Sequence, residues 1–169
     1  MGFKKIAIIG ISASGKSTFS RELHKVTDLP LFHMDKLFWR GKWEEVPEVE
    51  YLIEEQKLLQ KDKWIIEGYV DQKHTDRLKQ ADLIIYLDYS GLRCALYYIK
   101  RIIKHSRRAR PEMSEEALDA FEANYFWRIF MRRERPGIET ALRDVDKSKV
   151  VRLSSPRELR KFMNNKFKA

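Results

Sequence analysis

One run of residues near the N-terminus carries the strongest chemical signal in the sequence. Residues 10–17 read GISASGKS and match the phosphate-binding pattern G-x-x-x-x-G-K-S/T. Two glycines let the backbone curl so that successive N–H groups point inward around a phosphate. Lys16 would then reach the β- and γ-phosphates, and the Ser17 hydroxyl would ligate Mg²⁺. The alternative is a glycine-rich turn with an incidental lysine. We expect ATP to be held by Gly10, Ser12, Ala13, Ser14, Gly15, Lys16, Ser17 and Thr18.

Three acidic residues follow runs that are typical of β-strands, and ligands of an open α/β sheet bind at the carboxyl ends of its strands. Glu67 ends a buried-looking run and suits a metal role, because Mg²⁺ needs a carboxylate opposite Ser17 to hold its waters. Asp35 suits the orientation and deprotonation of a phosphoryl acceptor. Alternatively, Glu67 caps a loop and Asp35 caps a helix. We interpret Asp88 as a capping residue.

Basic residues gather in the second half of the chain. Residues 1–90 carry 14 Lys+Arg against 15 Asp+Glu, whereas residues 91–169 carry 20 against 10, which indicates an anionic partner. Arginines that close over a transferring phosphoryl group stabilise its charge. The first candidate group comprises Arg101, Lys104, Arg107, Arg108 and Arg110, and the second comprises Arg128, Arg132, Arg133 and Arg135. For both groups the alternatives are a solvated basic surface and a DNA-binding surface.

The elements that would position these residues alternate along the chain. Strands are predicted at residues 4–9, 31–33, 64–67, 83–87 and 149–153. Helices are predicted at about residues 17–26, 48–61, 73–80, 92–104 and 115–135. Ser155-Pro156-Arg157-Glu158 is a capping box that starts a last helix. This alternation favours an α/β fold with a mostly parallel sheet.

Apolar and aromatic side chains follow helical spacing in two of the predicted helices. The apolar side of helix 92–104 is formed by Leu92, Ala95, Leu96, Ile99, Ile102 and Ile103. We expect the stripe of helix 115–135 to face the core, and it comprises Phe121, Tyr125, Phe126, Ile129 and Phe130. A third aromatic group, Phe38, Trp39 and Trp43, closely follows Asp35. These three side chains either pack beside an acceptor site or stack on an acceptor ring.

Length and composition narrow the class of protein. A chain of 169 residues supports one domain with its own core, and the single Cys94 excludes an internal disulfide. The longest apolar runs are too short to span a bilayer. Gly15-Lys16 stands where a secretory signal would need its cleavage site. We therefore expect a cytoplasmic protein with no membrane partner.

Three further runs carry a family resemblance. HMDKLFWRGKW at residues 33–43, WIIEGY at 64–69 and RRARPEM at 107–113 resemble the bacterial topology modulation protein family, which is similar to adenylate kinase and other small P-loop kinases. The resemblance covers about residues 4–153. It implies a three-layer P-loop NTPase fold with a five-stranded parallel sheet of order 2-3-1-4-5. The single domain, residues 1–169, would hold an acceptor-binding segment at about 34–62 and a helical lid at about 104–114.

The resemblance also implies roles for individual residues. By similarity to adenylate kinases, Arg101 before the lid and Arg107 or Arg110 within it would contact the transferring phosphoryl group. Residues 67–69 fall where adenylate kinases have Asp-Gly-Phe, but the proline and the AMP-binding arginine that follow there are missing here. The resemblance therefore does not extend to AMP as the acceptor.

Together these observations predict an ATP- and Mg²⁺-dependent kinase that acts on a small-molecule or nucleotide acceptor. Its predicted catalytic residues are Lys16, Asp35, Arg101, Arg107 and Arg110, and its predicted metal-site residues are Ser17 and Glu67. The alternative is a P-loop ATPase that acts on or regulates DNA through its basic C-terminal half.

Overall fold

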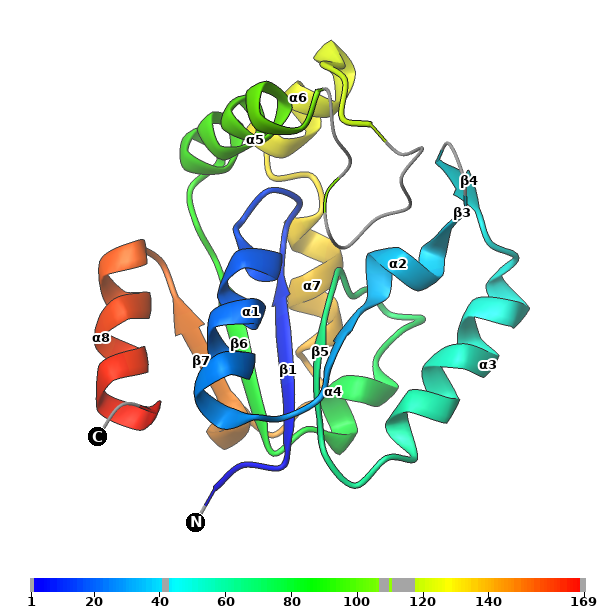
Figure 1. Ribbon diagram of the computed structural model, residues 1–169, viewed down its shortest axis with the longest axis vertical. Helices are drawn as coiled ribbons and strands as arrows, with labels where there is room; N and C mark the ends of the chain where they lie inside the picture. Colours follow the sequence, from blue (N-terminus) through cyan, green and yellow to red (C-terminus); the bar gives the residue numbers. More distant parts are fainter. Residues whose placement is uncertain (1, 41–42, 107–109, 111–117, 168–169) are drawn as a thin grey trace.

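A five-stranded parallel sheet forms the centre of the computed structural model, which describes residues 2–40, 43–106, 110 and 118–167 (Figure 1). The strands lie in the order β2-β5-β1-β6-β7. Their bounds are Lys5–Gly10 for β1, Leu31–His33 for β2, Trp64–Glu67 for β5, Leu83–Leu87 for β6 and Val150–Leu153 for β7. Counted along the chain, this is the order 2-3-1-4-5, so the predicted fold class is confirmed.

Strand β1 occupies the middle of the sheet because its side chains are apolar on both faces. Residues 6–9 are fully buried, as expected for a parallel strand that is covered on both faces. Ala7 pairs with Ile66 of β5 on one side and with Ile84 of β6 on the other. The carboxyl ends of all three strands therefore meet at one edge of the sheet, where the predicted site residues lie.

Helices cover both faces of the sheet. α1 (Lys16–Thr27) packs on β1, β2 and β5 and contacts α8 (Pro156–Phe167). α4 (Asp76–Gln80) and α7 (Arg135–Ala141) pack on β1, and Figure 1 shows α1 in front of the sheet and α7 behind it. This is the predicted three-layer arrangement.

The remaining elements surround the carboxyl edge of the sheet or complete its connections. The predicted acceptor-binding segment contains α2 (Met34–Phe38), the antiparallel pair β3 (Trp39–Arg40) and β4 (Glu44–Glu45), and α3 (Glu48–Leu59). α5 (Gly91–His105) and α6 (Ala123–Phe130) lie above the strand ends (Figure 1), and η1 (Lys147–Lys149) precedes β7. The predicted lid, 104–114, lies largely outside the described residues.

The single helix predicted at 115–135 is wrong in its described part. Residues 118–122 are not helical, α6 ends at Phe130, and Arg132 has a left-handed backbone with φ of 53°. Pro136 lies in the first turn of α7, because proline can start a helix but cannot continue one. The stripe predicted for this helix is split as well: Ile129 is buried, whereas Phe121 is 58% exposed.

Most of the apolar stripe predicted for α5 faces solvent instead of the core. Cys94, Ala95 and Tyr98 form its buried side, whereas four residues of the predicted stripe are exposed: Leu92, Leu96, Ile99 and Ile103. The physical reason is position, because α5 stands above the sheet and packs on α6 rather than lying on the sheet.

The last helix starts where the capping box predicted. Ser155 Oγ accepts a hydrogen bond from the Glu158 N–H at 3.3 Å, and the Glu158 carboxylate accepts one from the Ser154 N–H at 2.8 Å. Among the described residues, no helix is long and apolar enough to cross a membrane.

Candidate active site

The loop at residues 10–17 joins β1 to α1, and its backbone conformation requires glycine at two positions. Gly15 has φ of 92°, a conformation that side chains rarely adopt. At Gly10 a Cβ atom would lie 2.7 Å from Ser14 Oγ and 2.8 Å from the Leu87 carbonyl oxygen. Lys16 Nζ donates to the Ile11 carbonyl oxygen at 2.9 Å, across the loop. The sequence pattern thus forms a strand–loop–helix phosphate cradle.

A carboxylate from a distant segment lies on this loop. Glu134 accepts hydrogen bonds from the Ser12 N–H at 2.6 Å and from the Ser12 hydroxyl at 2.9 Å. Arg128 Nη2 lies 3.3 Å from the same carboxylate. The segment between α6 and α7 is therefore attached to the phosphate loop through Ser12.

Glu67 lies at the end of β5, close to the predicted metal-binding serine. Its carboxylate is buried and accepts a hydrogen bond from His33 Nδ1 at 2.6 Å. Burial raises the pKa of Glu67, but the hydrogen bonds from His33 and Ser17 and the charge of Lys16 outweigh burial and hold that pKa below its usual value. Glu67 is thus a carboxylate with a lowered pKa beside Ser17.

Asp35 belongs to the same cluster but has the opposite electrostatic character. Loss of solvent raises the pKa of Asp35, and the neighbouring Glu67 charge raises it further, while Lys16, Arg110 and Arg101 lower it. Two neighbouring carboxylates with pKa values pushed apart are typical of a site that divides metal binding and proton transfer between them. The structure therefore brings together the predicted loop, both predicted acids and two predicted arginines.

Arg101 and Arg110 share one partner that the sequence did not reveal. Arg101 Nε lies 3.6 Å from Asp119 Oδ1, and Arg110 Nε lies 3.2 Å from Asp119 Oδ2. Each guanidinium also lies over an aromatic ring, Tyr98 at 5.1 Å for Arg101 and Trp43 at 5.5 Å for Arg110. Asp119 thus holds the two arginines together, and both of their charges lower the pKa of Asp35. The third predicted arginine, Arg107, lies outside the described residues.

The second arginine group serves mainly to tie elements together. Asp88 accepts hydrogen bonds from Arg132, Arg135 and Arg152, and Arg152 also donates to Glu139 at 2.7 Å. The Arg132 guanidinium is paired with Asp88, and its contact with phosphates stays a prediction. The capping role of Asp88 is wrong, because Ser90 caps α5 by accepting from the Arg93 N–H at 3.4 Å.

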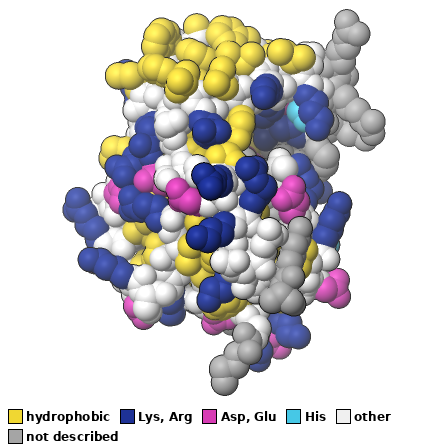
Figure 2. Space-filling model, turned by 90° about the vertical axis from the view of Figure 1, so that its left-hand side faces the viewer, with side chains coloured by type: hydrophobic (Ala, Val, Ile, Leu, Met, Phe, Trp, Pro, Cys, Tyr) yellow, Lys and Arg dark blue, Asp and Glu magenta, His cyan; other side chains and the backbone are white. Residues whose placement is uncertain are grey.

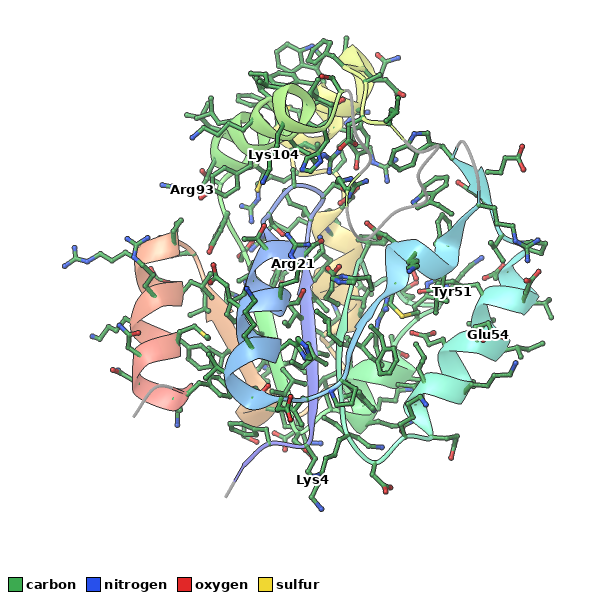
Figure 3. The ribbon with its side chains drawn as sticks, in the orientation of Figure 1. Lys4, Arg21, Tyr51, Glu54, Arg93 and Lys104 are labelled. Atoms are coloured by element: carbon green, nitrogen blue, oxygen red, sulfur yellow. The ribbon has the colours of Figure 1, made fainter. Side chains whose placement is uncertain are left out.

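The aromatic residues after Asp35 pack on one another. Phe38 and Trp39 meet edge to face with ring centroids 4.8 Å apart, and Trp39 meets Trp43 at 5.6 Å. Tyr51 of α3 packs on Phe38, and Figure 3 shows its ring on the side of α3 that faces α2. A cavity of about 220 Å³ behind them is lined by residues such as Leu37 and Tyr51, but not by Asp35 or the phosphate loop. This cavity is separate from the site.

The donor set around Ser17 fits magnesium bound together with a nucleotide. Mg²⁺ prefers hard oxygen ligands, and in nucleotide sites it takes one or two protein groups together with phosphates and waters. Ser17 supplies a hydroxyl and Glu67 an ionised carboxylate. Among the described residues, no group of three or more His, Cys, Asp or Glu side chains is arranged to hold a metal without a nucleotide.

The sequence did not lead us to predict three residues that contact the candidate site. His33 had a weak signal, because it ends a predicted strand two residues before Asp35. Asp119 and Glu134 had none, since their partners lie far away along the chain.

Comparisons of the whole structure find the same fold in solved kinases. A sugar kinase from Janibacter sp. HTCC2649 matches with a TM-score of 0.58 and 14% identity, over 99% of this chain and 95% of that one. A gluconokinase from Sinorhizobium meliloti 1021 matches with 0.58 and 12%, over 98% and 90%. Deoxyadenosine kinase from M. mycoides, with bound dCTP, matches with 0.52 and 18%, over 95% and 97%. No protein-family model and no curated protein matches the sequence. The chain therefore has the fold of P-loop kinases.

Proposed function

We propose that this protein is an ATP- and Mg²⁺-dependent kinase that phosphorylates a hydroxyl group of a small molecule. The observation that carries the proposal is the pair of carboxylates beside the phosphate-loop lysine, of which Glu67 has a lowered pKa and Asp35 a raised one. A carboxylate that is poised to take up a proton can deprotonate the hydroxyl group of an acceptor. The kinase fold supports the same conclusion.

Each residue has a distinct part in the proposed reaction. The loop amides and Lys16 bind the phosphates, and Ser17 and Glu67 would hold Mg²⁺, which would neutralise negative charge on the phosphates. Asp35 takes the proton from the acceptor hydroxyl. The oxygen of that hydroxyl forms a bond to the γ-phosphorus, the bond between this phosphorus and the bridging oxygen breaks, and ADP leaves. Arg101 and Arg110 stabilise the charge on the transferring group. Arg107 belongs to this group by resemblance.

The site favours a hydroxyl over a nucleotide phosphate as the acceptor. A phosphate oxygen is already ionised near neutral pH, so it needs no base and is repelled by Asp35 and Glu67. A hydroxyl needs such a base. The acceptors implied by the names of the three similar structures, a sugar, gluconate and deoxyadenosine, all offer hydroxyl groups.

We further propose that the chain is a cytoplasmic member of the topology modulation group, on the resemblance described above. The DNA-directed ATPase is the weaker proposal. Three of the basic residues that suggested DNA binding form ion pairs with Asp88 or Glu139 inside the protein. They are Arg132, Arg135 and Arg152.

A coupled assay of ADP release tests the proposed function. We expect turnover with ATP and Mg²⁺ to rise with one class among sugars, hydroxy acids and nucleosides, and to stay unchanged with nucleoside monophosphates or DNA. Lys16→Ala should abolish this turnover, and Lys25→Ala, at an exposed lysine near the other end of α1, is the matched control. Turnover stimulated by DNA alone, or wild-type turnover by folded Lys16→Ala, would overturn the proposal.

A further inference from the structure

One face of the protein exposes an apolar surface that nothing in the described chain covers. We call it the α5–α6 face. Figure 2 shows hydrophobic side chains gathered at the top of the molecule, where Figure 1 places α5 and α6. Its members are Leu92 (61% exposed), Leu96 (52%), Ile99 (38%), Ile103 (75%), Trp127 (56%) and Met131 (62%). A contiguous apolar surface of this kind marks an interaction site.

The spacing of the α5 residues indicates what kind of surface they meet. Leu92, Leu96, Ile99 and Ile103 follow one another at intervals of four, three and four, which is the spacing of a seam between paired helices. Within the part of the chain that the structure describes, these four residues face no such partner, because α6 packs on another side of α5. The stripe is therefore complementary to a second helix with the same spacing.

The area of the face matches that of a dimer interface. With about 200 Å² for a fully exposed large side chain, the six residues expose roughly 700 Å². A standard protein–protein interface buries about 800 Å² on each partner. The face is thus large enough for a specific contact between two copies.

The distribution of charge around the α5–α6 face bears on whether its partner is a second copy of the chain or an anionic surface. Arg93, Lys100 and Lys104 lie along one edge of the stripe, and Figure 3 shows Arg93 pointing away from the body of the molecule. α6 occupies the other edge. On the side of the molecule seen in Figure 2, a few acidic side chains lie among the basic ones below the face. In a two-fold pair centred between α5 and α6, the basic row stays at the hydrated rim.

We propose that the α5–α6 face binds a second copy of this chain, with α5 of one protomer packed against α5 and α6 of the other around a two-fold axis. Sedimentation velocity of the full chain over roughly 1–100 µM tests this proposal. The expected species has twice the 20.2 kDa mass of the chain.

Matched substitutions assign the contact to one face. Leu96→Glu and Ile103→Glu should each raise the dimer dissociation constant at least about tenfold. Ile53→Glu and Val49→Glu, at residues of α3 that are 51% and 70% exposed, should leave it unchanged. Circular dichroism checks that each variant is folded.

Several outcomes would overturn the proposal. One is a wild-type chain that stays monomeric throughout the concentration range. Another is a dimer that dissociates with the α3 variants but not with the α5 variants. Binding of the monomer to phosphatidylserine vesicles, lost in Leu96→Glu and Ile103→Glu, would assign the face to a membrane surface instead.

Discussion

Glu134 and Ser12 are 122 residues apart in sequence, yet the Glu134 carboxylate accepts hydrogen bonds from both the N–H and the hydroxyl of Ser12. Glu134 is only 7% exposed. Charge-assisted hydrogen bonds of this kind are about twice as strong as neutral ones. The contact attaches the segment between α6 and α7 to the phosphate loop and holds Arg128 near that loop.

We predict that Glu134→Ala lowers the free energy of unfolding by about 2 kcal/mol, because the Ser12 N–H and hydroxyl lose their acceptor. For a domain of this size the melting temperature should fall by roughly 4–8 °C. Glu54→Ala, at an exposed carboxylate paired with Lys57, is the control and should change little. Equal losses in the two variants would show that the buried contact adds no stability.

Substitutions of the two carboxylates should have different effects on the kinetics. Asp35→Asn should leave ATP binding nearly intact and reduce acceptor-dependent turnover by about 10²–10⁴-fold, the usual contribution of a general base. Glu67→Gln should instead raise the Mg²⁺ concentration needed for half-maximal turnover, because it loses the ionised ligand. Titrations of ATP binding and of Mg²⁺ on both variants check this. Weakened ATP binding with intact acceptor turnover in Asp35→Asn would reverse the assignment.

The pH dependence of turnover should report the raised pKa of Asp35. A base works only when ionised, so kcat should fall as the pH is lowered through that pKa, at a higher pH than the usual value of about 3.9 for aspartate. Glu67→Gln removes a neighbouring negative charge and should move this acid limb to lower pH. Glu54→Gln should not move it. If the residual activity of Asp35→Asn keeps the same fall at low pH, that fall is caused by the titration of another group.

Arg101 and Arg110 should act on the transition state rather than on substrate binding. Arg101→Ala and Arg110→Ala should each lower kcat by about 10²-fold or more with little change in the KM for ATP. Arg101→Lys should restore little activity, since an ammonium lacks the planar fork of a guanidinium. Arg93→Ala, on the outer side of α5, is the control. Steady-state kinetics that showed a raised KM and an unchanged kcat would give these arginines a binding role only.

The parts of the site that the sequence determined are local or follow from strand order. The phosphate loop needs only eight consecutive residues, because its geometry depends on two glycines at a set spacing between a strand and a helix. The meeting of Asp35 and Glu67 was predictable because neighbouring parallel strands end at the same edge of the sheet.

Tertiary structure decided which partner each charged or apolar side chain meets. The sequence pattern grouped Arg128 with Arg132, but packing turns Arg132 to Asp88 and Arg128 to Glu134. Helical spacing marked the apolar side of α5, yet periodicity identifies residues that share a face and not what covers it. Because α5 stands above the sheet rather than on it, its stripe faces outward, and the residues that form a core in one packing form an exposed surface in this one.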